Sequence, residues 1–119
     1  MLRVIVADDH PVVREGLRAI LDAEPDLEVV GEAASGAEAV ALAARLRPDV
    51  VLMDLRMPGT DGVTATGEIA AAGDARVLVV TTYDTDADIL RAVEAGATGY
   101  LLKDTPRREL AEAVRAAAR

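Results

Sequence analysis

Short apolar runs rich in β-branched residues recur five times along this chain of 119 residues, each separated from the next by a helix-like segment. The runs are Leu2–Ala7, Leu27–Glu32, Asp49–Met53, Arg76–Val80 and Thr98–Leu102. Apolar runs of this length, with little polar alternation, are typical of strands that are buried on both faces of a sheet. Strands that alternate with helices predict a parallel sheet with helices on both faces and right-handed crossovers. The pattern therefore predicts a single α/β domain.

The segments between the runs carry start and stop signals for helices. Pro11 suits a first helical position, and Ser35 with Glu38 forms a capping-box pattern. The apolar positions predicted for these two helices are Val13, Leu17, Ile20, Leu21, Val40, Ala43, Ala44 and Leu46.

Turn-forming residues 58–62 predict a loop, and an alanine-rich helix follows to about Ala72. Several N-cap candidates between residues 84 and 88 precede a helix that stops at Gly96. Thr105 and Pro106 open the last helix, which turns Leu110 and Val114 inward.

Composition excludes several classes of site and partner. The absence of cysteine excludes disulfides, thiolate metal sites and cysteine nucleophiles. No apolar run approaches the roughly 20 residues that cross a bilayer, and the chain starts on a strand-like run and not on a signal-type segment. These features predict a cytoplasmic domain with no membrane partner. The net charge of −8 and the lack of Phe and Trp argue against binding of nucleic acid by this domain itself.

Polar side chains follow four of the five predicted strands, whereas the second strand ends in Glu32 and offers no comparable group. They are Asp8, Asp9, Asp54, Thr81, Thr82 and Lys103. Sites in open parallel sheets form at the carboxyl ends of the strands, near the switch in strand order. If the first strand lies beside the third, three carboxylates converge with a lysine and a hydroxyl at one edge.

Three neighbouring carboxylates repel one another and need a compensating cation. Oxygen ligands with open positions suit Mg²⁺, which also accepts phosphate oxygens. An aspartate beside Mg²⁺ and an ammonium group is suited to attack a phosphoryl group. Lys103 is the only lysine among 13 basic residues, and its compact point charge suits a phosphate.

Four motifs in order make the chain similar to the response-regulator receiver domains of two-component systems, in particular the NarL/FixJ (LuxR-type) subfamily. They are Asp-Asp-His-Pro at 8–11, Met-Asp-Leu-Arg-Met-Pro-Gly at 53–59, Val-Thr-Thr-Tyr-Asp at 80–84 and Gly-Tyr-Leu-Leu-Lys-Asp at 99–104. The resemblance covers residues 1–119. It implies a flavodoxin-like (CheY-like), doubly wound, five-stranded parallel sheet with strand order 2-1-3-4-5.

The resemblance also implies a role for each site residue. Asp54 matches the phosphoacceptor, Lys103 the lysine that contacts phosphate, and Thr81, not Thr82, the switch hydroxyl. The acidic pair that binds Mg²⁺ is matched by Asp9 as the direct ligand and Asp8 acting largely through water. Arg56 matches the position whose backbone carbonyl is a metal ligand. Tyr100 matches the aromatic side chain that turns inward on activation.

Partners follow from the same resemblance. The phosphoryl donor would be a phosphohistidine on a sensor histidine kinase, and the domain would assist both phosphotransfer and dephosphorylation without being an enzyme. Phosphorylation would change the face built from the fourth helix, fifth strand and fifth helix, where a homodimer or effector contact forms. In the subfamily a helix-turn-helix domain follows the receiver and binds DNA; this chain carries none.

The chain departs from the family pattern at two positions. Asp104 stands where a proline with a cis bond often follows the lysine, which predicts a trans bond here. Thr60 stands where the family often has methionine.

Other interpretations of the same residues remain. Asp8 and Asp9 equally suit a helix cap, His10 suits helix entry better than catalysis, and Tyr100 suits an ordinary half-buried strand position. A cobalamin module of this fold needs glycine at Val13, and an aspartate-based phosphatase needs an acid at Arg56. An FMN-binding flavodoxin needs a hydroxyl- and glycine-rich loop after the first strand, where this chain is acidic. A non-phosphorylated interaction module would not need the full set of acceptor and ligand residues.

Overall fold

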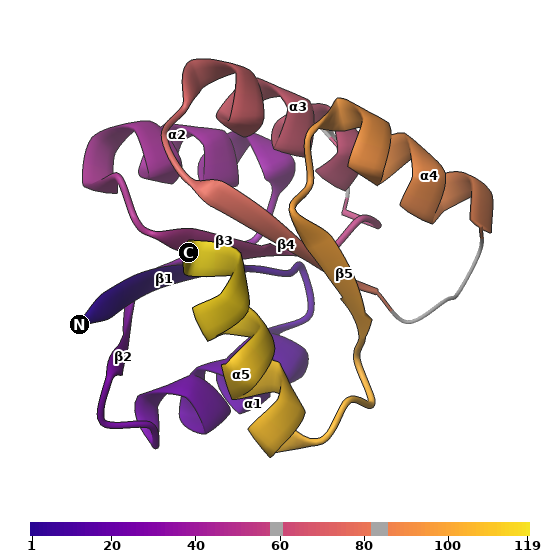
Figure 1. Cartoon of the computed structure of the whole chain (residues 1–119). Coiled ribbons are helices and arrows are strands. Elements are labelled where there is room, and N and C mark those ends of the chain that lie inside the picture. The colour runs from indigo at the N-terminus through magenta and orange to yellow at the C-terminus, as the bar shows by residue number, and fades with distance from the viewer. Residues whose placement is uncertain (58–60, 82–85) are drawn as a thin grey trace.

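The computed structural model describes residues 1–57, 61–81 and 86–119. Its parallel sheet has the order β2-β1-β3-β4-β5, as predicted, and the chain crosses it in a doubly wound path (Figure 1). The strands of the described residues are β1 (Leu2–Ala7), β2 (Leu27–Ala33), β3 (Val50–Met53), β4 (Arg76–Thr81) and β5 (Gly99–Leu102). Each boundary lies within one residue of the sequence prediction.

Helices cover both faces of the sheet. Figure 1 shows α1 and α5 on one face and α2, α3 and α4 on the other. Their bounds are α1 (Pro11–Asp22), α2 (Gly36–Leu46), α3 (Gly62–Ala72), α4 (Asp86–Ala95) and α5 (Arg107–Ala118). The prediction of an α/β domain with helices on both faces is therefore confirmed, and the described chain contains no helix of the length and hydropathy that a bilayer requires.

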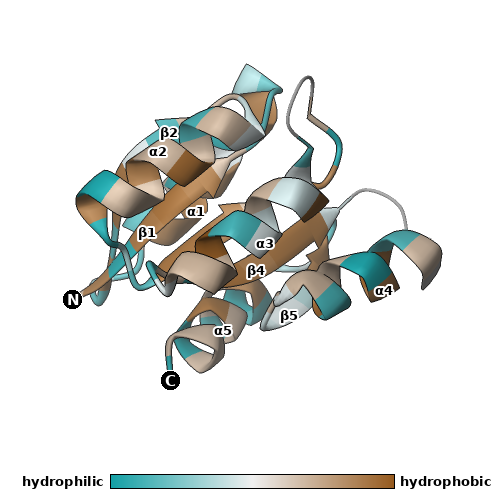
Figure 2. Cartoon of the chain, turned by 90° about the horizontal axis from the view of Figure 1, so that it is seen from above, coloured by the Kyte–Doolittle hydropathy of each residue, from teal (hydrophilic) through white to brown (hydrophobic). Residues whose placement is uncertain are grey.

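The core has two halves because successive strand residues point to opposite faces of the sheet. In β1, Val4 and Val6 pack with Leu21 and Val114 on the α1–α5 side. Ile5 lies on the opposite side with residues of β3, α2 and α3. Figure 2 shows the apolar strands covered by helices with mixed hydropathy. Burial on both faces explains why the strands are continuous apolar runs.

One predicted core position in α2 is wrong. Ala44 is exposed, whereas Ala39 and Ala43 are buried against the sheet and Leu42 is partly buried beside them. Positions four residues apart share one face of a helix, and Ala44 lies about 100° further round the axis than Ala43.

The capping-box prediction at the start of α2 is confirmed. The Ser35 hydroxyl accepts a hydrogen bond from the Glu38 backbone N–H at 3.2 Å. The Glu38 carboxylate accepts one at 3.3 Å from the N–H of Ala34, one residue before the cap.

Candidate functional site

The predicted site residues meet at the carboxyl edge of the sheet. Three of them are held there by backbone hydrogen bonds that continue the parallel pairing one residue past the strands. Asp8 N–H donates to Ala33 O, Asp54 N–H to Ala7 O and Lys103 N–H to Thr81 O, each at 2.9 Å. The strand order places β1 between β2 and β3, so Asp8 and Asp54 leave adjacent strands side by side.

A compact acidic cluster results. Asp8, Asp9, His10 and Asp54 each offer one ligand atom, and these four atoms lie within 4.8 Å of one another. Asp8 is 1% exposed and Asp54 is 4% exposed. Such a cluster of oxygen ligands can hold a metal ion.

Two buried oxygens of the cluster accept no hydrogen bond from the described residues. They are Asp8 Oδ2 and Asp9 Oδ1. Each faces a nitrogen instead: Lys103 Nζ lies 2.7 Å from Asp8 Oδ2, and His10 Nδ1 lies 3.0 Å from Asp9 Oδ1. Three carboxylates gathered this closely fit a hard divalent cation, and Mg²⁺ is the ion that prefers such a partly open set of oxygen ligands.

Lys103 reaches into the cluster from the end of β5. Its Nζ lies 2.7 Å from Asp8 Oδ2 and 3.5 Å from Asp54 Oδ2, and its side chain is 16% exposed. One ammonium against the carboxylates of Asp8, Asp9 and Asp54 leaves the group with an excess of negative charge. A second cation is therefore favoured at this edge.

The carboxyl group of Asp54 has a raised pKa. Burial is the main cause, and the nearby negative charge of Asp8 adds to it, while the Lys103 ammonium and the Arg56 N–H oppose it. A metal cation beside Asp54 would reverse this balance and favour the carboxylate. A cation at this position would therefore increase the ionised fraction of Asp54.

His10 lies at the edge of the cluster and begins α1. Its Nδ1 is 3.0 Å from Asp9 Oδ1, and the side chain is 67% exposed. Its backbone N–H donates to Asp8 Oδ1 at 2.9 Å, and its carbonyl accepts from Arg14 N–H at 3.0 Å. The helix-entry interpretation of His10 therefore fits, and Asp8 also forms the turn that leads into the helix.

Arg56 turns its side chain toward α4. Its Nη2 lies 3.0 Å from Asp88 Oδ2, and Arg91 pairs with the same carboxylate. Its backbone N–H donates to Asp54 Oδ1 at 3.4 Å, so the main chain of Arg56 stays beside the Asp54 carboxylate.

Thr81 and Tyr100 have contrasting environments. Thr81 is 3% exposed at the end of β4, beside the Lys103 backbone. Tyr100 is 48% exposed on β5, so its side chain is not turned inward in this structure. Thr82 and Thr60 lie outside the described residues. The Lys103–Asp104 bond is trans, as predicted.

The family model of the response regulator receiver domain matches residues 4–115. The chain belongs to this family. The receiver is 48% identical over 120 residues to the transcriptional regulatory protein LiaR of Bacillus subtilis, covering 100% of this chain and 57% of LiaR. It therefore spans little more than half the length of this curated relative.

Solved structures agree with the family. The signal receiver domain of the NarL response regulator of Mycobacterium tuberculosis superposes with a TM-score of 0.95 at 42% identity, covering 98% of this chain and 95% of that one. A LuxR-family response regulator from Aurantimonas has a TM-score of 0.93 at 42% identity, covering 99% and 85%. The resemblance to NarL- and LuxR-type receivers is thereby confirmed.

Gly62 is a site residue that the sequence analysis missed. It begins α3, and its N–H donates to Leu55 O at 3.1 Å. A Cβ at this position would lie 2.3 Å from the Asp54 carbonyl oxygen and 2.5 Å from Leu55 Cα. Only glycine lets the first turn of α3 approach the Asp54 backbone so closely. The available signal was a glycine directly after the N-cap residue Asp61.

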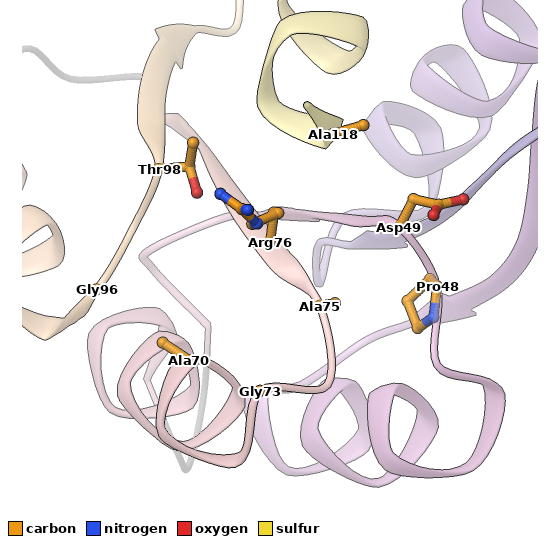
Figure 3. Close-up of a pocket in the computed structure, with 9 residues that line it drawn as sticks. All are labelled: Pro48, Asp49, Ala70, Gly73, Ala75, Arg76, Gly96, Thr98 and Ala118. Atoms are coloured by element: carbon orange, nitrogen blue, oxygen red, sulfur yellow. The ribbon is translucent and has the colours of Figure 1, made fainter.

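A hollow of about 390 Å³ lies at the opposite, amino edge of the sheet, near the start of β4 (Figure 3). Figure 3 shows the Asp49 carboxylate turned away from the Arg76 guanidinium. Asp49 Oδ2 instead accepts a hydrogen bond from Arg3 N–H at 2.8 Å. This hollow brings no set of catalytic or metal-binding groups together, so the acidic edge remains the candidate site.

Proposed function

We propose that this receiver domain is a switch operated by phosphorylation of Asp54, with a partner sensor histidine kinase as the donor and Mg²⁺ as the cofactor. The observation that carries the proposal is the acidic cluster: the carboxylates of Asp8, Asp9 and Asp54 converge, and one ammonium does not balance them, since Lys103 Nζ lies 2.7 Å from Asp8 Oδ2 and 3.5 Å from Asp54 Oδ2. This arrangement calls for a cation and for an anionic reactant.

In the proposed reaction, an Asp54 carboxylate oxygen attacks the phosphorus of a phosphohistidine. The phosphorus–nitrogen bond breaks, its electron pair returns to the imidazole, and an acyl phosphate remains on Asp54. The residues that would hold Mg²⁺ are Asp8, Asp9, Asp54 and the backbone carbonyl of Arg56. Bound Mg²⁺ supplies positive charge to the phosphoryl oxygens.

Lys103 serves the same reaction from the other side of the acceptor. Its ammonium offsets negative charge on the transferred group. The place of Lys103 at the end of β5 fixes the position of the ammonium beside Asp54. The same groups would assist later hydrolysis of the acyl phosphate. The domain is thus regulatory, and it assists its own phosphorylation and dephosphorylation.

The response would pass from Thr81 to Tyr100. The Thr81 hydroxyl would move toward the new phosphoryl group, and Tyr100 would turn inward on β5. Homodimer or effector contacts would then form on the face of α4, β5 and α5. Exposed apolar side chains on that face support the proposal: Leu90 (58%), Val93 (47%) and Tyr100 (48%).

The output of the whole protein is a further proposal. LiaR is named a transcriptional regulatory protein and extends well beyond the region that matches this receiver. We infer that residues 1–119 act with a helix-turn-helix effector domain that binds DNA, in the cytoplasm. The net charge of −8 supports DNA binding by the effector domain and not by the receiver itself.

Acetyl phosphate with Mg²⁺ tests the proposed acceptor. The protein should gain the mass of one phosphoryl group, Asp54→Asn should gain none, and chelation of Mg²⁺ should prevent the gain. Asp74→Asn is the matched control, because Asp74 precedes β4 at the opposite edge of the sheet. A phosphoryl adduct on Asp54→Asn would refute the acceptor assignment.

A further inference from the structure

Glu32 ends close to the site without joining the acidic cluster. It lies in β2, and its carboxylate is held by two arginines of α1. Arg14 Nε lies 3.0 Å from Glu32 Oε1, and Arg18 Nη1 lies 2.5 Å from Oε2. These contacts, the Arg18 hydrogen bond first among them, lower the pKa of Glu32 and keep it charged.

Arg14 and Arg18 differ in their second partner. Its Nη1 donates to the backbone carbonyl of Asp8 at 2.7 Å, whereas Arg18 pairs with Asp22 on its own helix. The Arg14 side chain is 20% exposed and that of Arg18 is 46% exposed. A half-buried guanidinium whose planar fork is fixed by one carboxylate can hold a second acceptor in a defined place.

The Asp8 backbone is thereby held on both sides. Its N–H donates to Ala33 O at 2.9 Å and its carbonyl accepts from Arg14. The direction of the carboxylate is set by the His10 N–H, 2.9 Å from Oδ1. The peptide group that Arg14 holds joins Asp8 to Asp9, so it orients both acids of the pair.

We propose that Arg14, fixed by Glu32, is a positioning residue that holds the Asp8–Asp9 peptide in the geometry that binds Mg²⁺. This inference rests on the proposed function. Removal of partners that orient metal ligands lowers metal affinity by about 10- to 100-fold in general. The sign of the effect separates positioning from charge, since loss of a nearby positive charge would by itself strengthen binding of a cation.

Calorimetric titration with Mg²⁺ tests the role. Arg14→Ala should weaken binding by about tenfold, and Arg14→Lys should also weaken it, although the charge is unchanged. Arg18→Ala removes the other α1–Glu32 ion pair and should change affinity less than about twofold. Glu32→Ala should add little to Arg14→Ala in the double variant, because both act through one contact.

A second readout needs no metal. The Asp9 amide belongs to the peptide whose carbonyl Arg14 holds, so its NMR shift in the Mg²⁺-free protein should move in both Arg14 variants and stay in Arg18→Ala. Unchanged or tighter Mg²⁺ binding by Arg14→Ala, or equal weakening by Arg18→Ala, overturns the positioning role. A wild-type protein that binds no Mg²⁺ contradicts the proposed function itself.

Discussion

The Lys103 ammonium lies closer to Asp8 than to Asp54, at 2.7 Å from Asp8 Oδ2 against 3.5 Å from Asp54 Oδ2. The lysine therefore compensates the most buried acid of the site. A cation that binds Asp8 and Asp9 would take over this task and leave the ammonium to face Asp54.

Replacement of Lys103 by methionine should destabilise the metal-free protein. Asp8 is 1% exposed, and loss of its partner leaves a buried charge uncompensated, which costs about 3–5 kcal/mol. Urea unfolding at pH 7 measures the loss, and Mg²⁺ should restore part of it. Arg45→Met, on the exposed surface of α2, should change stability by less than about 0.5 kcal/mol. Equal stability of the Lys103 variant and the wild type would show that Asp8 does not depend on the ammonium.

The raised pKa of Asp54 predicts the pH dependence of its substitution. Burial raises the pKa in the folded state, so this group favours folding below its unfolded pKa and loses that contribution as pH rises through the folded pKa. Without Mg²⁺, Asp54→Asn should therefore be more stable than the wild type at pH 7, with the difference vanishing toward pH 3. Urea unfolding across this range checks the trend. A difference that grows on acidification contradicts the raised pKa.

The fold could be predicted from the sequence because strands that are buried on both faces leave a direct pattern in it. Continuous apolar runs such as Arg76–Val80 indicate strands covered on both faces, and the residues after them indicate which edge carries the site. Strand order and the role of each acid came from the motifs and not from periodicity.

Contacts between distant segments could not be predicted in this way. The approach of Gly62 to the Asp54 backbone depends on how α3 enters its first turn, and the Arg14 contact depends on the pairing of β1 with β2. The sequence pattern assigns Glu32 no part in the site, because the link from Glu32 to Asp8 passes through the Arg14 side chain on α1. The exposed position of Ala44 reflects a rotation of α2 that its nearly all-apolar sequence does not determine.

Gly62→Ala should damage both stability and phosphorylation. The added Cβ would meet the Asp54 carbonyl oxygen at 2.3 Å, and such overpacking against backbone costs about 1–3 kcal/mol. Displacement of Asp54 should also slow phosphorylation by acetyl phosphate in the fraction that remains folded. Gly16→Ala is the control, since nothing lies within 4 Å of its Cβ and alanine favours a helix by about 1 kcal/mol. Normal stability and phosphorylation of Gly62→Ala would show that α3 can withdraw without cost.

Asp9→Ala should weaken Mg²⁺ binding more than any change at His10. Asp9 Oδ1 is buried and lies 3.0 Å from His10 Nδ1, whereas the His10 side chain itself is 67% exposed. Titration calorimetry should show at least a tenfold loss of affinity for Asp9→Ala, as for a lost direct ligand, and less than about a twofold change for His10→Ala. The reverse order of effects would move His10 into the ligand set and Asp9 out of it.

Thr81→Ala should separate phosphorylation from its consequence. The Thr81 side chain is buried at the end of β4, and its backbone, which already binds Lys103 N–H, is unaffected by the substitution. The variant should therefore gain one phosphoryl mass from acetyl phosphate at close to the wild-type rate. Analytical ultracentrifugation of the phosphorylated protein should then show loss of phosphorylation-dependent dimerisation. Thr98→Ala, at the amino end of β5, controls for loss of a threonine hydroxyl elsewhere in the sheet. Wild-type dimerisation of phosphorylated Thr81→Ala would show that the response bypasses this hydroxyl, and Tyr100 would then need another trigger.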